Sequence, residues 1–156
     1  NSFGDFSFAA SVEMDEANDQ FGWAIGGDYT FSFAGGSVNV GLGYIDADNN
    51  GDIAAISTAL ELDNGFAAGF VYADGDVRTA TNTDNNHYQI TAGYAFGPFS
   101  VGANYGEFEN GLAGYGLSGG YDLGGGAELL VGYGHTDNTG ATADVDQYSF
   151  GLSMSF

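Results

Sequence analysis

The sequence predicts an all-β fold, in which ten antiparallel strands form the wall of a transmembrane β-barrel. Ten segments alternate between apolar and small or polar residues, which is the period of two that a β-strand imposes on its side chains. Short glycine-rich turns alternate with longer acidic connections along the chain. All 10 tyrosines lie on the apolar side of their segments, where the aromatic girdle of a membrane barrel meets the lipid headgroups.

The first five segments each carry one apolar face, and their other face is mainly glycine, alanine, serine, threonine and asparagine. This alternation predicts strands with one face turned to an apolar environment and one to water. Their apolar faces consist, in chain order, of Phe6, Phe8, Ala10, Val12 and Met14; Phe21, Trp23, Ile25, Tyr29, Phe31 and Phe33; Val38, Val40, Leu42 and Tyr44; Ile56, Thr58, Leu60 and Leu62; and Phe66, Ala68, Phe70 and Tyr72.

The second five segments continue the pattern to the last residue of the sequence. The final one, YSFGLSMSF, places serine and glycine on one face and large apolar residues on the other, and it closes on an aromatic residue. The apolar faces consist of Tyr88, Ile90, Ala92, Tyr94 and Phe96; Phe99, Val101, Ala103 and Tyr105; Tyr115, Leu117, Gly119, Tyr121 and Leu123; Leu129, Val131 and Tyr133; and Tyr148, Phe150, Leu152, Met154 and Phe156.

The connections between these segments alternate in length. Short turns fall at 34–37, 63–65, 97–98 and 124–126, where glycine permits the positive φ that tight hairpins need. Longer polar connections are expected at 15–20, 46–52, 74–86, 107–113 and 136–145. In an outer-membrane barrel the long loops are extracellular and the short turns periplasmic, and an even strand count puts both chain ends on the periplasmic side.

Composition limits the function further. The 156 residues predict one domain, and the absence of cysteine excludes a disulfide framework and a thiolate metal site. With 21 acidic residues against one basic residue, the net charge is −20, so nucleic acid is excluded as a natural partner. Such a charge favours a surface or a lumen that attracts cations. The sequence shows no catalytic motif, and we expect no enzyme activity and no required cofactor.

Six carboxylates fall on the polar face within the segments, and we predict that they line a pore and favour cations. The other residues of that face, many of them glycine, are too small to fill a closed ten-stranded barrel. The space is therefore wet, or the strands belong to a wider barrel. The predicted pore-lining residues are Asp5, Glu13, Asp28, Glu61, Asp122 and Glu128.

Aromatic residues near the long connections predict a lipid girdle on the apolar face. The final segment also resembles the C-terminal signal that the barrel-assembly machinery reads, with Tyr148, Phe150, Leu152, Met154 and Phe156 as its apolar positions. The predicted girdle consists of Trp23, Tyr44, Tyr72, Tyr88, Tyr105, Tyr115, Tyr133 and Tyr148.

Taken together, the ten-strand pattern, the glycine-rich turns, the acidic loops and the YSFGLSMSF terminus resemble the C-terminal part of a general diffusion porin of Gram-negative bacteria, of the alphaproteobacterial type. The resemblance implies a sixteen-stranded, homotrimeric outer-membrane barrel, in contact with lipid and lipopolysaccharide, that lets small hydrophilic solutes diffuse passively. It also implies a third long loop folded inward and facing a basic cluster. This sequence has no such cluster. If the chain is complete, 74–86 with Arg78 would be that loop; if it is a portion, the loop lies elsewhere.

Two local motifs suggest other chemistry. Asp46, Asp48, Asn50 and Asp52 present oxygen ligands at alternate positions around Gly51, as calcium loops do, although no glutamate follows at the twelfth position. A solvated acidic hairpin loop explains the same residues. The two histidines each have a nearby carboxylate, and an enzyme of the outer-membrane rim would use such pairs, but no flanking signature supports one. These pairs are His87 with Asp84 and His135 with Asp137.

Two alternative functions use the same strands. A small outer-membrane barrel that acts as an anchor or adhesin would need a plugged interior, and the sequence contains no candidate plug. A secreted glycine-rich β-protein that assembles through its strand edges would also show alternating apolar strands with few lysines. A closed barrel migrates differently on a gel before and after heating, whereas an open assembly does not.

Overall fold

The computed structural model describes residues 2–15, 20–47, 51–77, 83–84, 86–138 and 143–155. These residues form one antiparallel sheet of twelve strands, and each long strand pairs with its neighbours in the sequence. The long strands are β2 (Phe6–Asp15), β3 (Gln20–Phe33), β4 (Gly36–Asp46), β5 (Gly51–Leu62), β6 (Phe66–Val77), β8 (His87–Phe96), β9 (Phe99–Phe108), β10 (Ala113–Gly124), β11 (Ala127–Asp137) and β12 (Val145–Met154).

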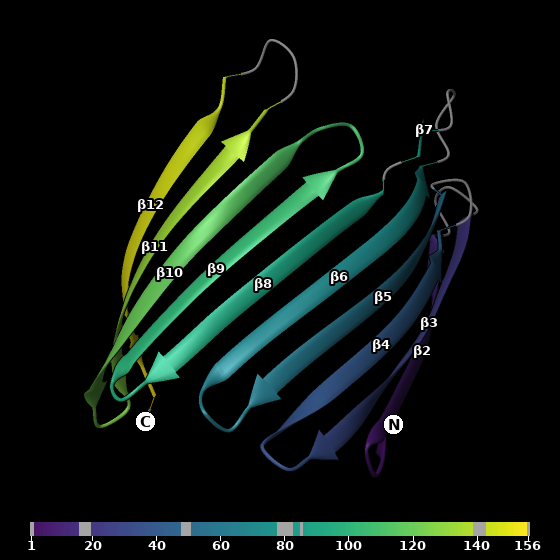
Figure 1. Ribbon diagram of the computed structural model, residues 1–156. Helices are drawn as coiled ribbons and strands as arrows, with labels where there is room; N and C mark the ends of the chain where they lie inside the picture. The colour runs from purple at the N-terminus through teal and green to yellow at the C-terminus, as the bar shows by residue number, and fades with distance from the viewer. Residues whose placement is uncertain are drawn as a thin grey trace.

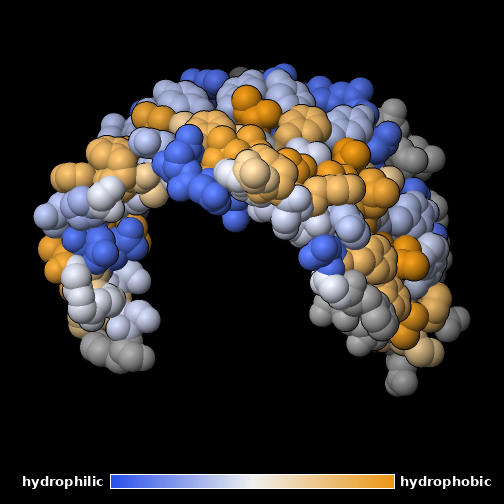
Figure 2. Space-filling model, turned by 60° about the horizontal axis from the view of Figure 1, so that its bottom comes forward, coloured by the Kyte–Doolittle hydropathy of each residue, from blue (hydrophilic) through white to orange (hydrophobic). Residues whose placement is uncertain are grey.

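The sheet is a single curved layer whose described strands do not close on themselves. Its order runs from β1 and β2 at one edge to β12 at the other, and Figure 1 shows this row of tilted strands, with the short turns together at the lower end. Seen end-on, the molecule is an arch around a wide hollow (Figure 2). The described residues therefore form part of a barrel wall rather than a closed barrel.

Glycine fixes the short turns. Gly35 and Gly65 adopt φ values of 100° and 90°, a left-handed region that costs other L-residues free energy. A side chain at Gly65 would also collide with the carbonyl oxygen of Ala95 on the neighbouring hairpin. These turns hold adjacent strands in register, so that Phe33 lies opposite Gly36 and Glu61 opposite Ala67.

The register places the two kinds of side chain on opposite faces along the whole sheet. Tyr72 lies opposite Tyr88, Tyr105 opposite Tyr115, and Tyr133 opposite Tyr148. Because cross-strand partners share a face, the apolar residues form one continuous surface. No apolar side chain is buried among the described residues, and Tyr148 and Phe150 are 80% and 76% exposed. A single layer with one apolar face needs an apolar environment, not a second layer, to cover it.

The structure corrects the expected strand boundaries at the long-connection end. There β6 continues to Val77, β9 to Phe108 and β11 to Asp137, although 74–77, 107–108 and 136–137 were expected to be loop. Two short strands were not expected: β1 (Ser2–Phe3) pairs with β2, and β7 (Thr83–Asp84) pairs with β6. Backbone pairing extends past the point where side-chain alternation stops, because hydrogen bonding between strands does not depend on apolar side chains.

Candidate pore wall

The concave face of the arch carries the small and polar residues of the alternating pattern. Hydrophilic side chains project from it into the hollow in Figure 2. Across β2 to β6 the face contains a hollow of about 900 Å³. Six of the residues that line it are Ser7, Asp28, Asn39, Gly41, Ser57 and Val71.

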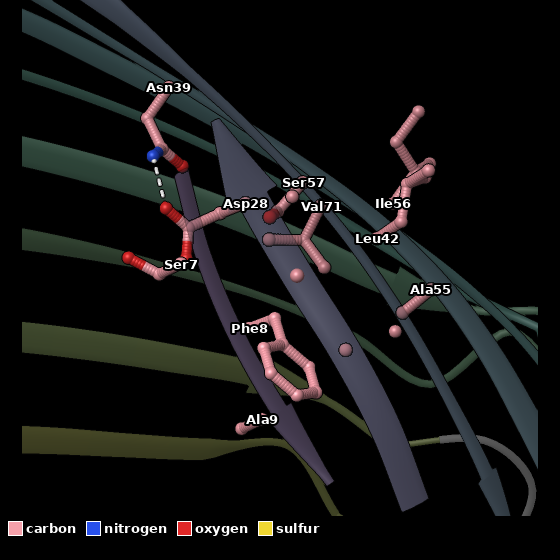
Figure 3. Close-up of a pocket in the computed structure, with 14 residues that line it drawn as sticks. Ser7, Phe8, Ala9, Asp28, Asn39, Leu42, Ala55, Ile56, Ser57 and Val71 are labelled. Atoms are coloured by element: carbon pink, nitrogen blue, oxygen red, sulfur yellow. Dashed lines mark hydrogen bonds between the residues drawn. The ribbon is translucent and has the colours of Figure 1, made fainter. Parts of the chain in front are cut away.

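Asp28 lies in the middle of this face, and neighbouring polar groups fix its position (Figure 3). The Asn39 amide nitrogen donates to Asp28 Oδ2 at 2.9 Å and also approaches Thr30 Oγ1 at 3.0 Å. Asn39 is neutral, so it orients the carboxylate without cancelling its charge. The centre of the wall therefore carries a positioned negative charge next to small side chains.

At two glycines of the concave face, a serine side chain of the neighbouring strand lies close to the glycine backbone. The hydroxyl of Ser57 lies 2.6 Å from where a Cβ of Gly41 would be, and the hydroxyl of Ser118 lies 2.7 Å from the equivalent point at Gly102. The serine side chains thus lie across the backbone of the neighbouring strand instead of extending into the hollow. This arrangement leaves the concave face lined with hydroxyl groups rather than with long side chains.

Carboxylates cluster where this face meets the short turns. Asp122 lies directly opposite Glu128 across β10 and β11, and its Oδ1 accepts a hydrogen bond of 2.7 Å from the Gly124 amide. Glu61 lies opposite Ser37 near the next pair of turns. Asp5 is not in a strand as expected: Gly4 has a φ of 65° and forms a turn with Asp5 between β1 and β2.

The remaining predicted pore-lining residue, Glu13, lies at the opposite end of the wall, across from Gly22. The single basic residue of the chain, Arg78, lies outside the described residues. Within the described ranges, no lysine or arginine therefore faces these carboxylates. The assignment of all six to a pore remains a prediction, and the concave position of the strand residues among them supports it.

The predicted girdle residues lie in one row on the convex face at the long-connection end. Trp23 contacts Tyr44 with ring centroids 5.2 Å apart, and Tyr133 contacts Tyr148 at the same distance. Tyr88 and Tyr105 are 6.1 Å apart on neighbouring strands. Such rings carry an apolar body and a polar hydroxyl or indole N–H group, which suits them to the boundary between lipid tails and headgroups.

A second aromatic row lies near the short turns and was not included in the predicted girdle. Phe99 contacts Phe96 at 5.6 Å and Tyr121 at 4.9 Å, and Tyr29 contacts Phe31 at 4.5 Å. The sequence contained the signal, because these residues share the apolar parity and precede or follow glycine turns. Two rows bounding an apolar band are what a membrane barrel requires.

Two carboxylates lie on the convex face beside the girdle: Glu107, which was expected in the loop 107–113 but belongs to β9, and Asp146 of β12. Glu107 Oε2 accepts hydrogen bonds from the hydroxyls of Tyr88 at 2.6 Å and Tyr105 at 2.8 Å. Asp146 Oδ1 accepts one from the Tyr133 hydroxyl at 2.7 Å. These pairings fix the tyrosine hydroxyls at the upper margin of the apolar band, and periodicity within one strand cannot reveal them.

The structure brings together only part of the residues considered for other chemistry. His87 lies on the concave side, with its ring 4.4 Å from that of Phe108, whereas His135 pairs with Asp137 of β11 and Asp146 of β12. Of the predicted calcium ligands, Asp46 and Asp52 lie opposite each other across β4 and β5. Asp48, Asn50 and the terminal Phe156 lie outside the described residues, as does the Asp84 side chain.

Comparison with known proteins agrees with this architecture. The model of the Gram-negative porin family matches residues 1–155, so the chain belongs to that family. Membership implies a location in the outer membrane. No curated protein matches the sequence significantly. Among the described residues, no helix is long and apolar enough to cross a membrane.

A solved structure of a porin, refined at 1.8 Å resolution, has the same fold. It superposes with a TM-score of 0.72 at 23% sequence identity, over 100% of this chain and 60% of the porin chain. The present chain thus spans a little over half the length of that porin. The curvature of the open sheet is that of a porin wall.

Proposed function

We propose that the chain forms the wall of a water-filled outer-membrane channel, through which small hydrophilic solutes and ions diffuse passively. The supporting observation is the division of one sheet into two faces. The convex face is an apolar band between two aromatic rows, and the concave face carries serine, glycine and carboxylates around an open hollow. Lipid would cover the first face and water the second.

The complete channel in this proposal is wider than ten strands. An eight-stranded barrel has an interior that side chains just fill, whereas barrels of about 16 to 18 strands leave an aqueous channel. The chain matches 60% of a porin chain and stays open along both sheet edges, which supports the wider barrel. We further propose a homotrimer that is inserted by the barrel-assembly machinery, with lipopolysaccharide around its outer half and the long connections outside the cell.

Cation preference follows from the charge of the concave face. A carboxylate attracts a monovalent cation 8 Å away by about 0.5 kcal/mol in water, which raises the local cation concentration about twofold. Asp28 supplies this attraction for cations in the middle of the wall, and the carboxylates at the short-turn end would strengthen the attraction. Without a basic partner in the described ranges, the field along the wall has a single sign.

The experiment is to measure single-channel conductance and reversal potential of the native protein in a planar bilayer under a salt gradient. We expect large openings and a reversal potential of the sign for cation preference. Asp28→Asn should lower the cation-to-anion permeability ratio at least about twofold, because the amide keeps the shape but loses the charge. Glu107→Gln removes the same charge from the convex face and should leave the ratio unchanged. Anion preference in the native protein, or equal effects of both variants, would contradict the proposal.

Heat-dependent migration on a gel tests the closed barrel independently of conductance. The folded protein should migrate differently from the boiled protein, as closed barrels do. Identical migration together with fibrils that grow with concentration would instead indicate assembly through the open edges, the secreted alternative. Heat-dependent migration without conductance would favour an anchor or adhesin.

We also propose that the connection after β4 binds calcium weakly. Asp46 and Asp52 lie across from each other at its base, and oxygen ligands of this kind suit Ca²⁺. Adding Ca²⁺ should raise the thermal midpoint of the native protein, and Asp52→Asn should reduce that rise. An equal rise in both proteins would place calcium elsewhere.

A further inference from the structure

A histidine and three aspartates meet at the outer end of the last hairpin. His135 and Asp137 end β11, Asp144 precedes β12, and Asp146 lies in its second position. One ligand atom from each of His135, Asp137 and Asp144 lies within 4.8 Å of the other two. The cluster is separate from the concave wall, and the diffusion channel proposed above makes no use of it.

Hydrogen bonds hold the imidazole in one orientation. Its Nδ1 lies 2.8 Å from Asp146 Oδ1, which also accepts the hydroxyl of Tyr133, and its ring packs 5.2 Å from that of Tyr115. Its Nε2 lies 3.1 Å from Asp137 Oδ1. Neutral imidazole carries hydrogen on one nitrogen only, and in the tautomer that donates Nδ1–H to Asp146 the other nitrogen, Nε2, is the metal-binding atom. The Nε2 lone pair then faces a carboxylate.

Asp144 is positioned as well. Its Oδ1 accepts a 3.1 Å hydrogen bond from the Asn138 amide, and Asn138 Nδ2 donates to the carbonyl oxygen of Ala143 at 2.8 Å. Three electron-pair donors, Nε2 and two carboxylates, therefore converge. No lysine or arginine lies nearby within the described ranges. A proton or a metal ion between these groups would relieve their mutual repulsion.

We propose that His135, Asp137 and Asp144 bind a zinc ion, and that Asp146 positions the imidazole for it. Zinc binds imidazole and carboxylate at about 2.0 to 2.2 Å in a tetrahedron, which sets ligand atoms roughly 3.4 Å apart. The His135–Asp137 separation of 3.1 Å is already close to this, and the Asp144 ligand atom, within 4.8 Å of both, would move closer on binding. A ligating histidine characteristically donates its other N–H to a carboxylate, which is the geometry of His135 and Asp146. Bound zinc would join β11 to the start of β12 at the outer surface.

The test is isothermal titration of the full protein, folded in detergent, with zinc chloride in millimolar Mg²⁺, which occupies non-specific carboxylate sites. One zinc ion should bind per chain. His135→Ala and Asp144→Asn should each weaken binding by more than the roughly 10- to 100-fold expected for the positioning variant Asp146→Asn. Heat-dependent gel migration checks that each variant is folded.

His87→Ala is the matched control, since it removes the other histidine of the chain from the concave side, and zinc affinity should not change. Cobalt provides an independent readout: bound Co²⁺ should show the visible absorption of four-coordinate geometry in the native protein and lose it in His135→Ala. Equal zinc affinity in the native protein and His135→Ala, or no zinc binding by the native protein in Mg²⁺, would overturn the proposal. Either result would assign the converging groups to a protonated imidazole.

Discussion

The division of the sheet into a lipid face and a water face makes a direct prediction about adjacent residues of one strand. Leu117 and Ser118 lie next to each other in β10, at the same depth and on opposite faces. Leu117 is 52% exposed on the convex face, whereas Ser118 lines a hollow on the concave face. Arginine at Leu117 should destabilise the folded protein strongly, and arginine at Ser118 should not.

The magnitude follows from the position of Leu117. It lies two residues inside the girdle residue Tyr115, or about 7 Å along the strand and about 5 Å in depth for a strand tilted by about 40°. Arginine facing lipid costs about 2 to 4 kcal/mol at the midplane and less towards the interface, so about 2 kcal/mol applies here. The substitution also removes the leucine side chain, about half of which would contact lipid, and this loss adds about 1 kcal/mol to the destabilisation. The total of about 3 kcal/mol corresponds to roughly a 100-fold change in the unfolding equilibrium.

The assay is denaturant-induced unfolding and refolding of the full protein in phosphatidylcholine vesicles, followed by the fluorescence of its one tryptophan, Trp23. The free energy of unfolding of Leu117→Arg should fall by about 3 kcal/mol, and that of Ser118→Arg should stay within about 0.5 kcal/mol of the native value. Leu117→Ala separates the loss of the leucine from the cost of the charge. If the two arginine variants are equally stable, the assignment of the convex face to lipid is wrong.

Three further predictions rest on other parts of the wall. Gly65→Ala should lower the free energy of unfolding by more than about 1 kcal/mol, and by more than Gly35→Ala does. Both glycines have positive φ, but of the two only Gly65 has a backbone carbonyl oxygen where the alanine Cβ would be. Equal denaturation midpoints of the two variants would contradict this clash. Trp23 fluorescence should be quenched by brominated lipid and not by aqueous iodide, since its ring lies in the convex girdle; the opposite pattern would remove it from the girdle. Cation preference should weaken between 0.1 M and 1 M salt as the Debye length falls from about 10 Å to about 3 Å; a constant permeability ratio would mean that a narrow constriction, not the wall charge, sets selectivity.

The faces and turns of this fold could be predicted from the sequence because both depend on local physical constraints. In a strand between lipid and water, apolar and polar side chains must alternate. The convex face of β12 could therefore be identified without knowing the strand that pairs with it, from Tyr148, Phe150, Leu152 and Met154. Glycine at a two-residue turn supplies a conformation that other residues avoid. The family assignment made from this pattern was confirmed, as was the arrangement of ten long antiparallel strands.

The strand ends at the long connections were not predictable for a related reason. Beyond the girdle both faces of the wall meet water, so side chains no longer need to alternate, and Glu107 and Asp137 have the composition of a loop. The backbone nevertheless continues to pair there. Asp5 shows the opposite error: it continues the alternation of β2, but Gly4 turns the chain before it. Side-chain periodicity reports the environment of a strand, and it reports pairing only where the two faces differ.

The same limit explains which parts of the site were missed. Two hydrogen-bonded pairs join residues on neighbouring strands: Glu107 with Tyr88, and Asp146 with Tyr133. Such pairs form only in the right strand register, and that register is set by the lengths of both the short turns and the long connections. His135 with Asp137 was visible as a short sequence motif, but Asp144 and Asp146 join it only because β12 returns alongside β11. The proposed zinc site is therefore a property of the hairpin, whereas the proposed pore lining is a property of single strands.

The curvature of the wall and its proposed function depend on the same asymmetry of side-chain size. When a sheet bends, side chains on the concave face converge and those on the convex face spread apart. Gly41 and Ser57 on the inside, opposed to Tyr44 and Ile56 on the outside of the same strands, suit that bend, whereas large inward residues would have to fill the interior or flatten the sheet. Small concave residues that permit the arch also leave room for water beside Asp28. A sequence that builds this wall consequently suits the wet lumen proposed above, in which the charge on the wall would act on passing ions.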